Sequence, residues 1–300
     1  MKKILLVALV SSLMVGCGGS DSDSNTTTNP TPNTPDTGAP EVNPKPDSEN
    51  INLQGIYDGT TAQGQEVLGV VTDSNELWFL YSDPYRNGID GFINGKISQS
   101  KNNFTAKAKD YNISTNSTYP ATISSGFTTD KNISGTLDYG RLDTVGFNLD
   151  HNASASKVSL STMDLGLKAY KGSVGITGVG VENASITIEM DGKIIGTGAS
   201  GCKINGNVSN TKARNYLDVK IQFGSSPCAL TNTTFNGVAY YNAEDKSLMV
   251  TSTDSKNNYG LVFVGEVVVD GVGGFMDLID KDIQGSELDK ELSKPIEKIS

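Results

Sequence analysis

The chain has 300 residues, of which 24 are Lys or Arg and 34 are Asp or Glu, so its formal net charge is −10. Nucleic-acid binding depends on clustered Lys and Arg, and so acidic a chain is excluded as a nucleic-acid-binding protein. A single histidine also excludes a histidine-based zinc site, because such sites use several His or Cys ligands.

Residues 1–16 are predicted to be a secretory signal peptide. They start with Met-Lys-Lys, continue with the apolar run Ile4–Val10 and end at Gly16. The apolar run is shorter than the roughly 20 residues that a membrane-spanning helix needs. Residues 13–17, Leu-Met-Val-Gly-Cys, resemble the lipobox of bacterial lipoproteins, which implies cleavage after Gly16 and lipidation of Cys17. Gly18 follows, and the absence of aspartate there implies sorting to the outer membrane.

Residues 17–50 are predicted to be a disordered tether that begins at the lipidated cysteine. The stretch from 18 to 50 contains six of the ten prolines and no aromatic residue. Such a segment cannot bury enough apolar surface to offset the entropy lost on ordering. As a flexible coil it spans on the order of 30 Å, which would hold the folded part away from the lipid.

The region from about residue 51 to 270 is predicted to be all-β. Short alternating or apolar runs are separated by Gly, Asn, Asp and Ser, as is typical of strands and turns. Strands are expected at 67–71, 76–81, 92–97, 185–190, 217–223 and 260–269. Asp191-Gly192 predicts a tight hairpin with a primed turn, which needs positive φ. No sustained helical period precedes residue 275, and a short helix is expected only in the acidic tail, 271–300.

Three pairs of short segments indicate that the β region is duplicated. Residues 93–98 match 204–209, residues 57–60 match 170–173, and residues 135–139 match 237–241, at offsets of 111, 113 and 102. Three matches in the same order predict two modules, at 51–160 and 161–270. Each module suits a small antiparallel barrel or a sandwich.

This layout resembles two-module outer-membrane lipoproteins of Gram-negative bacteria. In general style it also resembles the β-barrel domains of surface lipoproteins such as transferrin-binding protein B. Both resemblances imply a location at the outer membrane. Neither carries a ligand-binding residue over to this chain.

Cys202 and Cys228 remain once Cys17 is used for lipidation. Outside the cytoplasm two such cysteines most often pair, so a disulfide is predicted, with two buried thiols as the alternative. Their wide spacing and the absence of a nearby histidine disfavour metal binding.

The densest aromatic segment is Trp78-Phe79-Leu80-Tyr81, followed by Asp83-Pro84-Tyr85-Arg86. It is interpreted as a strand buried on both faces that turns at Asp83-Pro84. The alternative is a platform for sugar or peptide, because Tyr and Trp give large contact areas at low entropic cost. Tyr85 and Arg86 are the residues expected to be exposed for ligand binding.

The acidic tail contains a pattern similar to an EF-hand calcium loop. Oxygen-bearing side chains follow one another around Gly285, and the candidate calcium ligands are Asp280, Asp282, Gln284, Ser286 and Glu291. The alternative is a short terminal helix that begins at Ser286. No other cofactor is expected.

No catalytic motif surrounds His151, the only histidine, which is expected in a solvent-exposed turn between the modules. The leading hypothesis is a non-enzymatic binding or adhesion module on the outer membrane, anchored by lipid, with a protein or glycan partner. A periplasm-facing accessory, inhibitor or immunity lipoprotein is the second hypothesis, and a hydrolase is the third. The sequence leaves open which face of the outer membrane the protein occupies.

Overall fold

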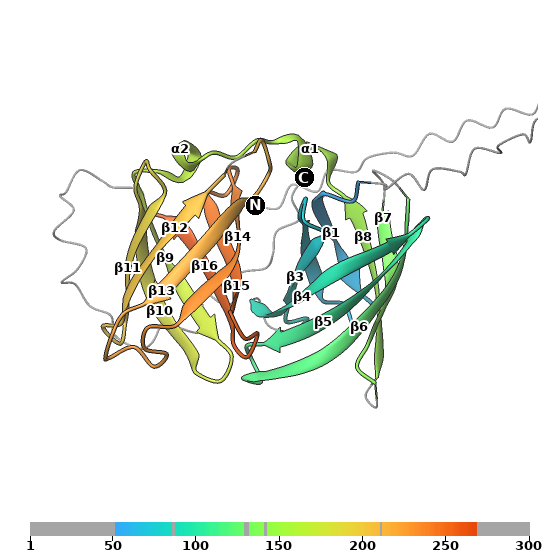
Figure 1. Ribbon diagram of the computed structural model, residues 1–300, viewed down its shortest axis with the longest axis horizontal. Helices are drawn as coiled ribbons and strands as arrows, with labels where there is room; N and C mark the ends of the chain where they lie inside the picture. The colour runs from blue at the N-terminus through green and yellow to red at the C-terminus, as the bar shows by residue number, and fades with distance from the viewer. Residues whose placement is uncertain (1–51, 86–87, 129–131, 141–142, 211, 269–300) are drawn as a thin grey trace, which may run out of the picture. The chain divides into compact units, whose positions relative to one another are not determined.

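The structure is a computed structural model that describes residues 52–85, 88–128, 132–140, 143–210 and 212–268. In this part of the chain, the strands form two closed antiparallel barrels of eight strands each (Figure 1). The predicted all-β class with two tandem modules is confirmed, and both modules are barrels rather than sandwiches. The predicted tether, 17–50, and the predicted helix in the tail lie outside the described residues.

The strands of each barrel follow one another in chain order around the wall, and the last strand pairs with the first. The first barrel consists of β1 Gly55–Thr61, β2 Glu66–Val71, β3 Glu76–Ser82, β4 Ile89–Ser100, β5 Asn103–Asn112, β6 Ser117–Thr128, β7 Asn132–Asp138 and β8 Thr144–His151. The second consists of β9 Lys168–Ile176, β10 Gly180–Ile188, β11 Lys193–Gly198, β12 Lys203–Ser209, β13 Leu217–Phe223, β14 Thr234–Asn242, β15 Ser247–Asp254 and β16 Gly260–Val267.

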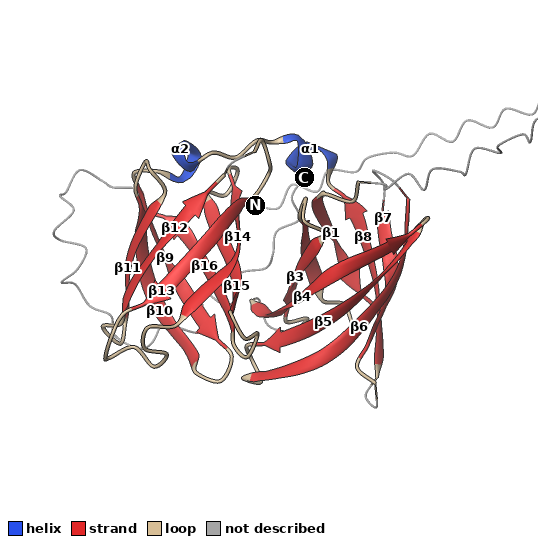
Figure 2. Ribbon diagram, viewed as in Figure 1, coloured by secondary structure: helices blue, strands red, loops and turns tan. Residues whose placement is uncertain are grey.

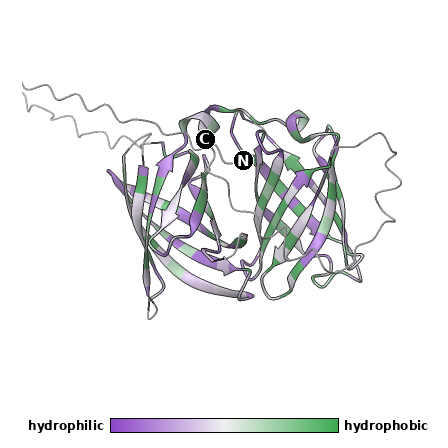
Figure 3. Cartoon of the chain, turned by 180° about the vertical axis from the view of Figure 1, so that it is seen from behind, coloured by the Kyte–Doolittle hydropathy of each residue, from purple (hydrophilic) through white to green (hydrophobic). Residues whose placement is uncertain are grey.

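Alternation of apolar and polar residues directs each strand's side chains to opposite faces of the barrel wall. In β13 every second residue from Leu217 to Phe223 is buried, and the residues between them are exposed. Figure 3 shows the same alternation as changes of colour along many strands. Because the side-chain period is two residues, this pattern also determines the register with the neighbouring strands.

Glycine makes the closing seam possible in both barrels. A Cβ at Gly59 in β1 would lie 2.0 Å from the carbonyl oxygen of Asn148 in β8. A Cβ at Gly172 in β9 would lie 1.9 Å from the carbonyl oxygen of Val264 in β16. Both distances are far below van der Waals contact, so only glycine allows the first and last strands to approach this closely.

The duplicated segments correspond only in part. Tyr57 and Tyr170 lie in the first strand of their barrels, and each hydroxyl donates to a leucine carbonyl just upstream, at 2.8 and 3.3 Å. The matched segments at 93–98 and 204–209 lie in fourth strands, β4 and β12. The third match is wrong as a structural equivalence, because Gly135 lies in the seventh strand, β7, whereas Gly237 lies in the sixth strand, β14.

Two short helices that the sequence did not predict lie in the connection between β8 and β9, α1 Ala153–Lys157 and α2 Thr162–Leu165 (Figure 2). Each is too short to show a hydrophobic period. Side-chain hydrogen bonds at their first turns stabilise them instead: Asn152 accepts from the backbone N–H of Ala155, and Asp164 accepts from that of Ser161. No helix among the described residues is long and apolar enough to cross a bilayer.

The hairpin predicted at Asp191-Gly192 is present between β10 and β11, but its predicted turn class is wrong. Gly192 has φ +87° and donates from its N–H to the carbonyl of Glu189, whereas Asp191 is not among the residues with positive φ. A primed two-residue turn would need positive φ at both central residues, as in type I′, or at the first, as in type II′. The observed turn is a three-residue loop that ends in a left-handed glycine.

Strand β3 is buried on both faces, which confirms the interpretation of the aromatic segment as a two-sided buried strand. Leu77 and Phe79 face the interior of the first barrel, whereas Trp78 and Leu80 belong to a separate apolar cluster outside it. That outer cluster also contains Tyr216, Tyr240 and Val262 from the second barrel's part of the chain. Two-sided burial explains why this strand lacks polar alternation.

A charged network joins the β2–β3 turn to the segment before β13. The guanidinium of Arg214 lies 3.2 Å from the carboxylate of Asp73 and 2.6 Å from that of Asp218. The hydroxyl of Tyr216 donates to Asp73 at 3.0 Å, and Lys212 pairs with the same carboxylate at 2.7 Å. Hydrogen bonds and nearby positive charge lower the pKa of Asp73.

Candidate functional site

The interior of the first barrel contains a cavity of about 160 Å³. It lies toward one end of the barrel, because its lining side chains come from the ends of β1, β3, β5 and β7 and the beginnings of β2 and β8. The lining is mostly aliphatic and aromatic, with a few polar groups on one side. It comprises Thr61, Gln65, Val67, Phe79, Tyr81, Ile93, Asp110, Asn112, Ile123, Leu137, Tyr139, Val145, Phe147 and Leu149.

Glycines on neighbouring strands position two of the aromatic side chains. Gly69 pairs with Phe79, and a Cβ at Gly69 would lie 3.1 Å from the Phe79 ring. Gly91 pairs with Tyr81, and a Cβ there would lie 2.5 Å from the Tyr81 hydroxyl. These rings therefore pack against the barrel wall over residues that have no side chain, an arrangement that recurs in sheets.

A buried carboxylate is the centre of the cavity's polar side. Asp110 is 5% exposed. Its Oδ1 accepts a hydrogen bond of 2.6 Å from the Tyr81 hydroxyl, and its Oδ2 accepts one of 2.7 Å from the Tyr139 hydroxyl. Asn112 donates from Nδ2 to the Tyr81 oxygen at 3.2 Å. Both phenols donate to the carboxylate, which is the pattern expected around an acceptor-only, ionised group.

The protein environment acts on this carboxylate in two directions. Burial raises the pKa of Asp110 above its usual value, and the hydrogen bonds from Tyr81 and Tyr139 partly oppose that rise. The same burial, together with the neighbouring carboxylate, raises the pKa of both tyrosines. The hydroxyls therefore stay protonated and remain donors throughout the physiological pH range.

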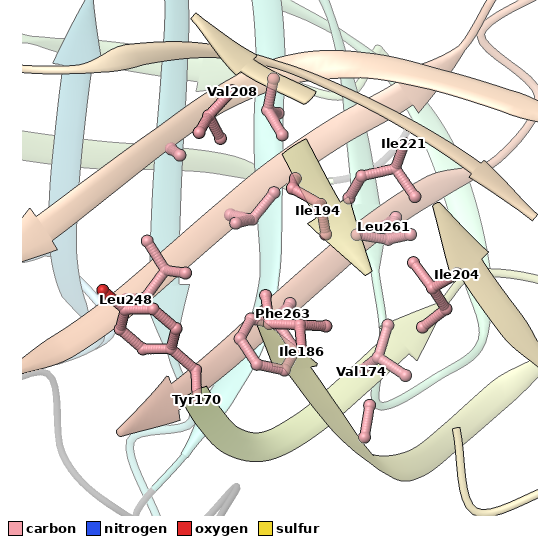
Figure 4. Packing of buried hydrophobic residues seen from close by; sticks show 14 of the residues in the cluster. Tyr170, Val174, Ile186, Ile194, Ile204, Val208, Ile221, Leu248, Leu261 and Phe263 are labelled. Carbon is pink, nitrogen blue, oxygen red and sulfur yellow. The ribbon is translucent and has the colours of Figure 1, made fainter. Parts of the chain in front are cut away.

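Among the described residues, the space at the centre of the second barrel is much smaller. Its interior cavity measures about 20 Å³ and is lined only by aliphatic and phenyl side chains, among them Ile186, Ile221 and Phe263. Figure 4 shows these apolar side chains converging from several strands. Eight-stranded barrels can be filled by side chains or can hold one small ligand, and the centre of the second barrel is filled by side chains.

Two further recesses lie outside the barrel centres. A polar groove of about 820 Å³ is lined by residues of both barrels, including Trp78 and four lysines at 96, 107, 109 and 220. The indole N–H of Trp78 is buried and has no hydrogen-bond partner among the described residues. A recess of about 220 Å³ lies in the second barrel beside the disulfide and Glu182, whose carboxylate accepts from the backbone N–H of Ser200.

The predicted disulfide between Cys202 and Cys228 is present, with the two Cα atoms 4.5 Å apart. It joins the residue that precedes β12 to the loop between β13 and β14, and both cysteines contribute to the second barrel's apolar core. The alternative of two free thiols is therefore wrong.

The other predicted site residues are only partly described. Tyr85 is 93% exposed and lies in the β3–β4 connection, at the same end of the first barrel as the cavity. Arg86, Cys17 and the candidate calcium ligands Asp280, Asp282, Gln284, Ser286 and Glu291 lie outside the described residues. Within the described residues, no group of three or more His, Cys, Asp or Glu could hold a metal ion.

His151 is not in an exposed turn. It is the last residue of β8, pairs with Tyr57 of β1 and packs against that ring with the centroids 5.3 Å apart. Its Nδ1 is buried. Closure of the barrel extends β8 through this residue, which local turn propensity could not indicate.

The cavity residues were missed by sequence reasoning, although one signal was available. In β5 every second side chain, starting from Phe104, faces the inside of the barrel. The series consists of Phe104, Ala106, Ala108, Asp110 and Asn112. Two polar residues in phase with an apolar series indicate polar groups inside the barrel. The partners from β3 and β7 are far away in sequence, so only the closed wall brings them together.

No protein-family model and no curated protein matches the sequence. Among solved structures, a mutant transferrin-binding protein B from Haemophilus parasuis Hp5 matches 70% of this chain and 67% of its own length, at 7% identity and a TM-score of 0.27. The protein from serogroup B Neisseria meningitidis matches at 9% identity and a TM-score of 0.26, and this chain spans 59% of its length. Intact Ap-TbpB, with N and C lobes, matches at 7% identity and a TM-score of 0.26, over 73% of this chain and 78% of its own. At this similarity the matches carry no argument about a ligand or partner.

Proposed function

We propose that this protein is a non-enzymatic binding lipoprotein of the bacterial outer membrane, anchored through Cys17, whose first barrel holds a small ligand. The observation that carries the proposal is the contrast between the barrel interiors: that of the first holds a cavity of about 160 Å³ with a buried carboxylate, and the centre of the second holds about 20 Å³ lined by apolar groups. The packed centre of the second barrel then serves as a scaffold. Cavities that combine an apolar lining with a few convergent polar groups are characteristic of ligand sites.

The carboxylate and the histidine are unsuited to joint catalysis. Asp110 lies near the end of β5 and His151 at the end of β8, at opposite ends of the same antiparallel barrel. Both oxygens of Asp110 already accept hydrogen bonds from tyrosines, and His151 packs on Tyr57. These contacts orient the groups for structure and binding rather than for proton transfer.

The cavity proposal is tested by thermal unfolding of the mature chain with a panel of small aromatic and alkyl compounds of positive, zero and negative charge. At least one compound is expected to raise the unfolding temperature in a saturable manner. Val145→Trp, which places a large side chain in the lining, is expected to abolish every such shift. If no compound raises the temperature, the first barrel is not a ligand site.

The anchor and the exposed face are tested in cells. Cys17→Ala is expected to move the protein from the membrane to the soluble fraction, because acyl chains supply the attachment. Protease treatment of intact cells separates display at the surface from the accessory, inhibitor or immunity role in the periplasm. Digestion of the barrels supports surface display, and complete protection supports the periplasmic alternative.

Tyr85 is the proposed contact for a protein or glycan partner. Its side chain is 93% exposed, which is unusual for a large aromatic residue and makes it available to a macromolecule. Tyr85→Ala is expected to weaken capture of such a partner without changing the unfolding temperature. Unchanged capture would remove Tyr85 from the binding surface.

A further inference from the structure

We infer that the ligand of the first barrel is a small organic cation, an ammonium group on an apolar body about the size of benzene, with Asp110 as its counter-ion. This inference rests on the proposed function, and it adds the ligand's charge and size. Three features of the cavity carry it: its single charge, its aromatic lining and its volume.

The cavity contains one carboxyl group, and no cationic side chain belongs to its described lining. Asp110 is the only acidic residue of the described lining, and Lys, Arg and His are absent from that lining. A buried carboxylate without a positive partner is costly, because both burial and the missing ion pair oppose ionisation. A bound cation would supply the missing partner inside the cavity.

Hydrogen bonds hold the Asp110 carboxylate in one orientation, and it can still accept further hydrogen bonds. The Tyr81 and Tyr139 hydroxyls each donate one hydrogen bond to a different oxygen of Asp110. A carboxylate has about four acceptor positions, so about two remain for a ligand. An ammonium group, which has only donors, matches this remaining capacity, whereas a ligand carboxylate would be repelled.

Four aromatic residues belong to the lining of the cavity. Phe79, Tyr81, Tyr139 and Phe147 all line the cavity, and the Phe79 and Phe147 rings meet edge to face with their centroids 5.8 Å apart. Ring faces attract cations, and the attraction increases when water is excluded. The rings therefore favour the charged group and also accept its apolar body.

The volume sets the size of the ligand. The cavity measures about 160 Å³. An apolar cavity of about 150 Å³ accommodates benzene. A single ring with a short aminomethyl arm therefore approaches the upper limit, and larger molecules would need the loops at this end to move.

Calorimetric titration of the mature chain in lipid nanodiscs, with empty nanodiscs as blank, tests the inference with three probes of one shape. These are benzylamine, benzyl alcohol and benzoate, which are cationic, neutral and anionic near neutral pH. Benzylamine is expected to bind at least about tenfold more tightly than benzyl alcohol, because a desolvated ion pair is formed only by the amine. Benzoate is expected not to bind.

Two variants locate the effect. Asp110→Asn is expected to remove the preference for benzylamine over benzyl alcohol. Asp138→Asn is the matched control, since Asp138 ends β7 at the same end of the barrel but is exposed. Asp138→Asn should leave the preference for benzylamine unchanged. That result would exclude a long-range effect of removing one negative charge.

The outcomes separate the two proposals. Equal binding of benzylamine and benzyl alcohol to the unmodified chain would overturn the cation inference while leaving a ligand-binding barrel in place. Binding of none of the three probes, together with a panel that causes no thermal shift, would overturn the proposed function itself. The comparison of probes on the unmodified chain remains decisive even if Asp110→Asn does not fold.

Discussion

Tyr81 in β3 donates a hydrogen bond of 2.6 Å to Asp110 in β5, and the bond passes over the intervening strand β4 on the inner face of the first barrel. The bond satisfies a buried carboxylate oxygen and fixes the tyrosine against one side of the cavity. The stability of the barrel and the geometry of the proposed site thus depend on the same contact.

Tyr81→Phe is expected to destabilise the protein by about 1–3 kcal/mol, because it leaves a buried carboxylate oxygen without its donor. Urea unfolding at neutral pH measures this loss. Tyr85→Phe removes a hydroxyl from a side chain that is 93% exposed and serves as the control. The control is expected to change stability by less than about 0.5 kcal/mol. Equal effects of the two substitutions would contradict the structural role of the Tyr81 hydroxyl.

Asp110→Asn is expected to flatten the pH dependence of stability on the acidic side. Because burial raises the pKa of Asp110, the folded state holds this proton to a higher pH than the unfolded chain does. The contribution of this proton to the free energy of unfolding is complete below the unfolded-state pKa of about 3.9. It is lost as the pH rises through the pKa of Asp110 in the folded state. Because asparagine does not titrate, this pH-dependent contribution to stability is absent from the variant.

Unfolding free energies measured at several values between about pH 3.5 and pH 7 test the Asp110 prediction. The exposed control Asp138→Asn should retain the original dependence. An unaltered slope in Asp110→Asn would show that its titration is not coupled to folding.

Gly91→Ala is expected to destabilise the first barrel by about 1–3 kcal/mol, since overpacking forces backbone or side chains to shift. The new Cβ would lie 2.5 Å from both the Tyr111 carbonyl oxygen and the Tyr81 hydroxyl. Gly146→Ala is the matched control, because its Cβ would meet only Ala62 at an ordinary 3.6 Å. Thermal unfolding compares the two, and a loss in the control as large as in Gly91→Ala would argue against the steric explanation.

Asp73→Ala is expected to cost about 2–4 kcal/mol, because Arg214 is buried and loses one of its two carboxylate partners. Glu189→Ala removes a carboxylate from an exposed pair with Lys193 at 3.8 Å and is expected to cost less than about 0.5 kcal/mol. Chemical unfolding measures both. A negligible effect of Asp73→Ala would mean that Asp218 alone is sufficient for Arg214.

Replacing both Cys202 and Cys228 by serine is expected to lower stability by about 3.5 kcal/mol, according to the chain-entropy model for a loop with a sequence separation of 26. The second barrel should unfold first in the variant, since the bridge lies within it. Hydrogen exchange resolved by residue measures the two barrels separately. Equal loss of protection in both barrels would show that they unfold as one unit.

The sequence by itself determined the β class, the two modules and the disulfide. Alternating or apolar runs between turn residues produce strands whatever their partners are, as in 217–223, which coincides with β13. The two remaining cysteines left only one pairing within the folded region. The strand pattern is local in the sequence, and the disulfide follows from the number of cysteines. Both can therefore be predicted from one sequence without knowledge of the tertiary structure.

The tertiary structure alone decided that the interior of the first barrel contains a cavity and which residues line it. Asp110 is 29 residues from Tyr81 and 29 residues from Tyr139 in the sequence. Closure of the barrel wall makes both tyrosines its hydrogen-bonded neighbours. Closure also placed His151 in a strand and joined the first and last strands of each barrel at glycine. Long-range strand pairing has no local signal, because the residues that meet across a barrel are selected by register and volume rather than by adjacency in the chain.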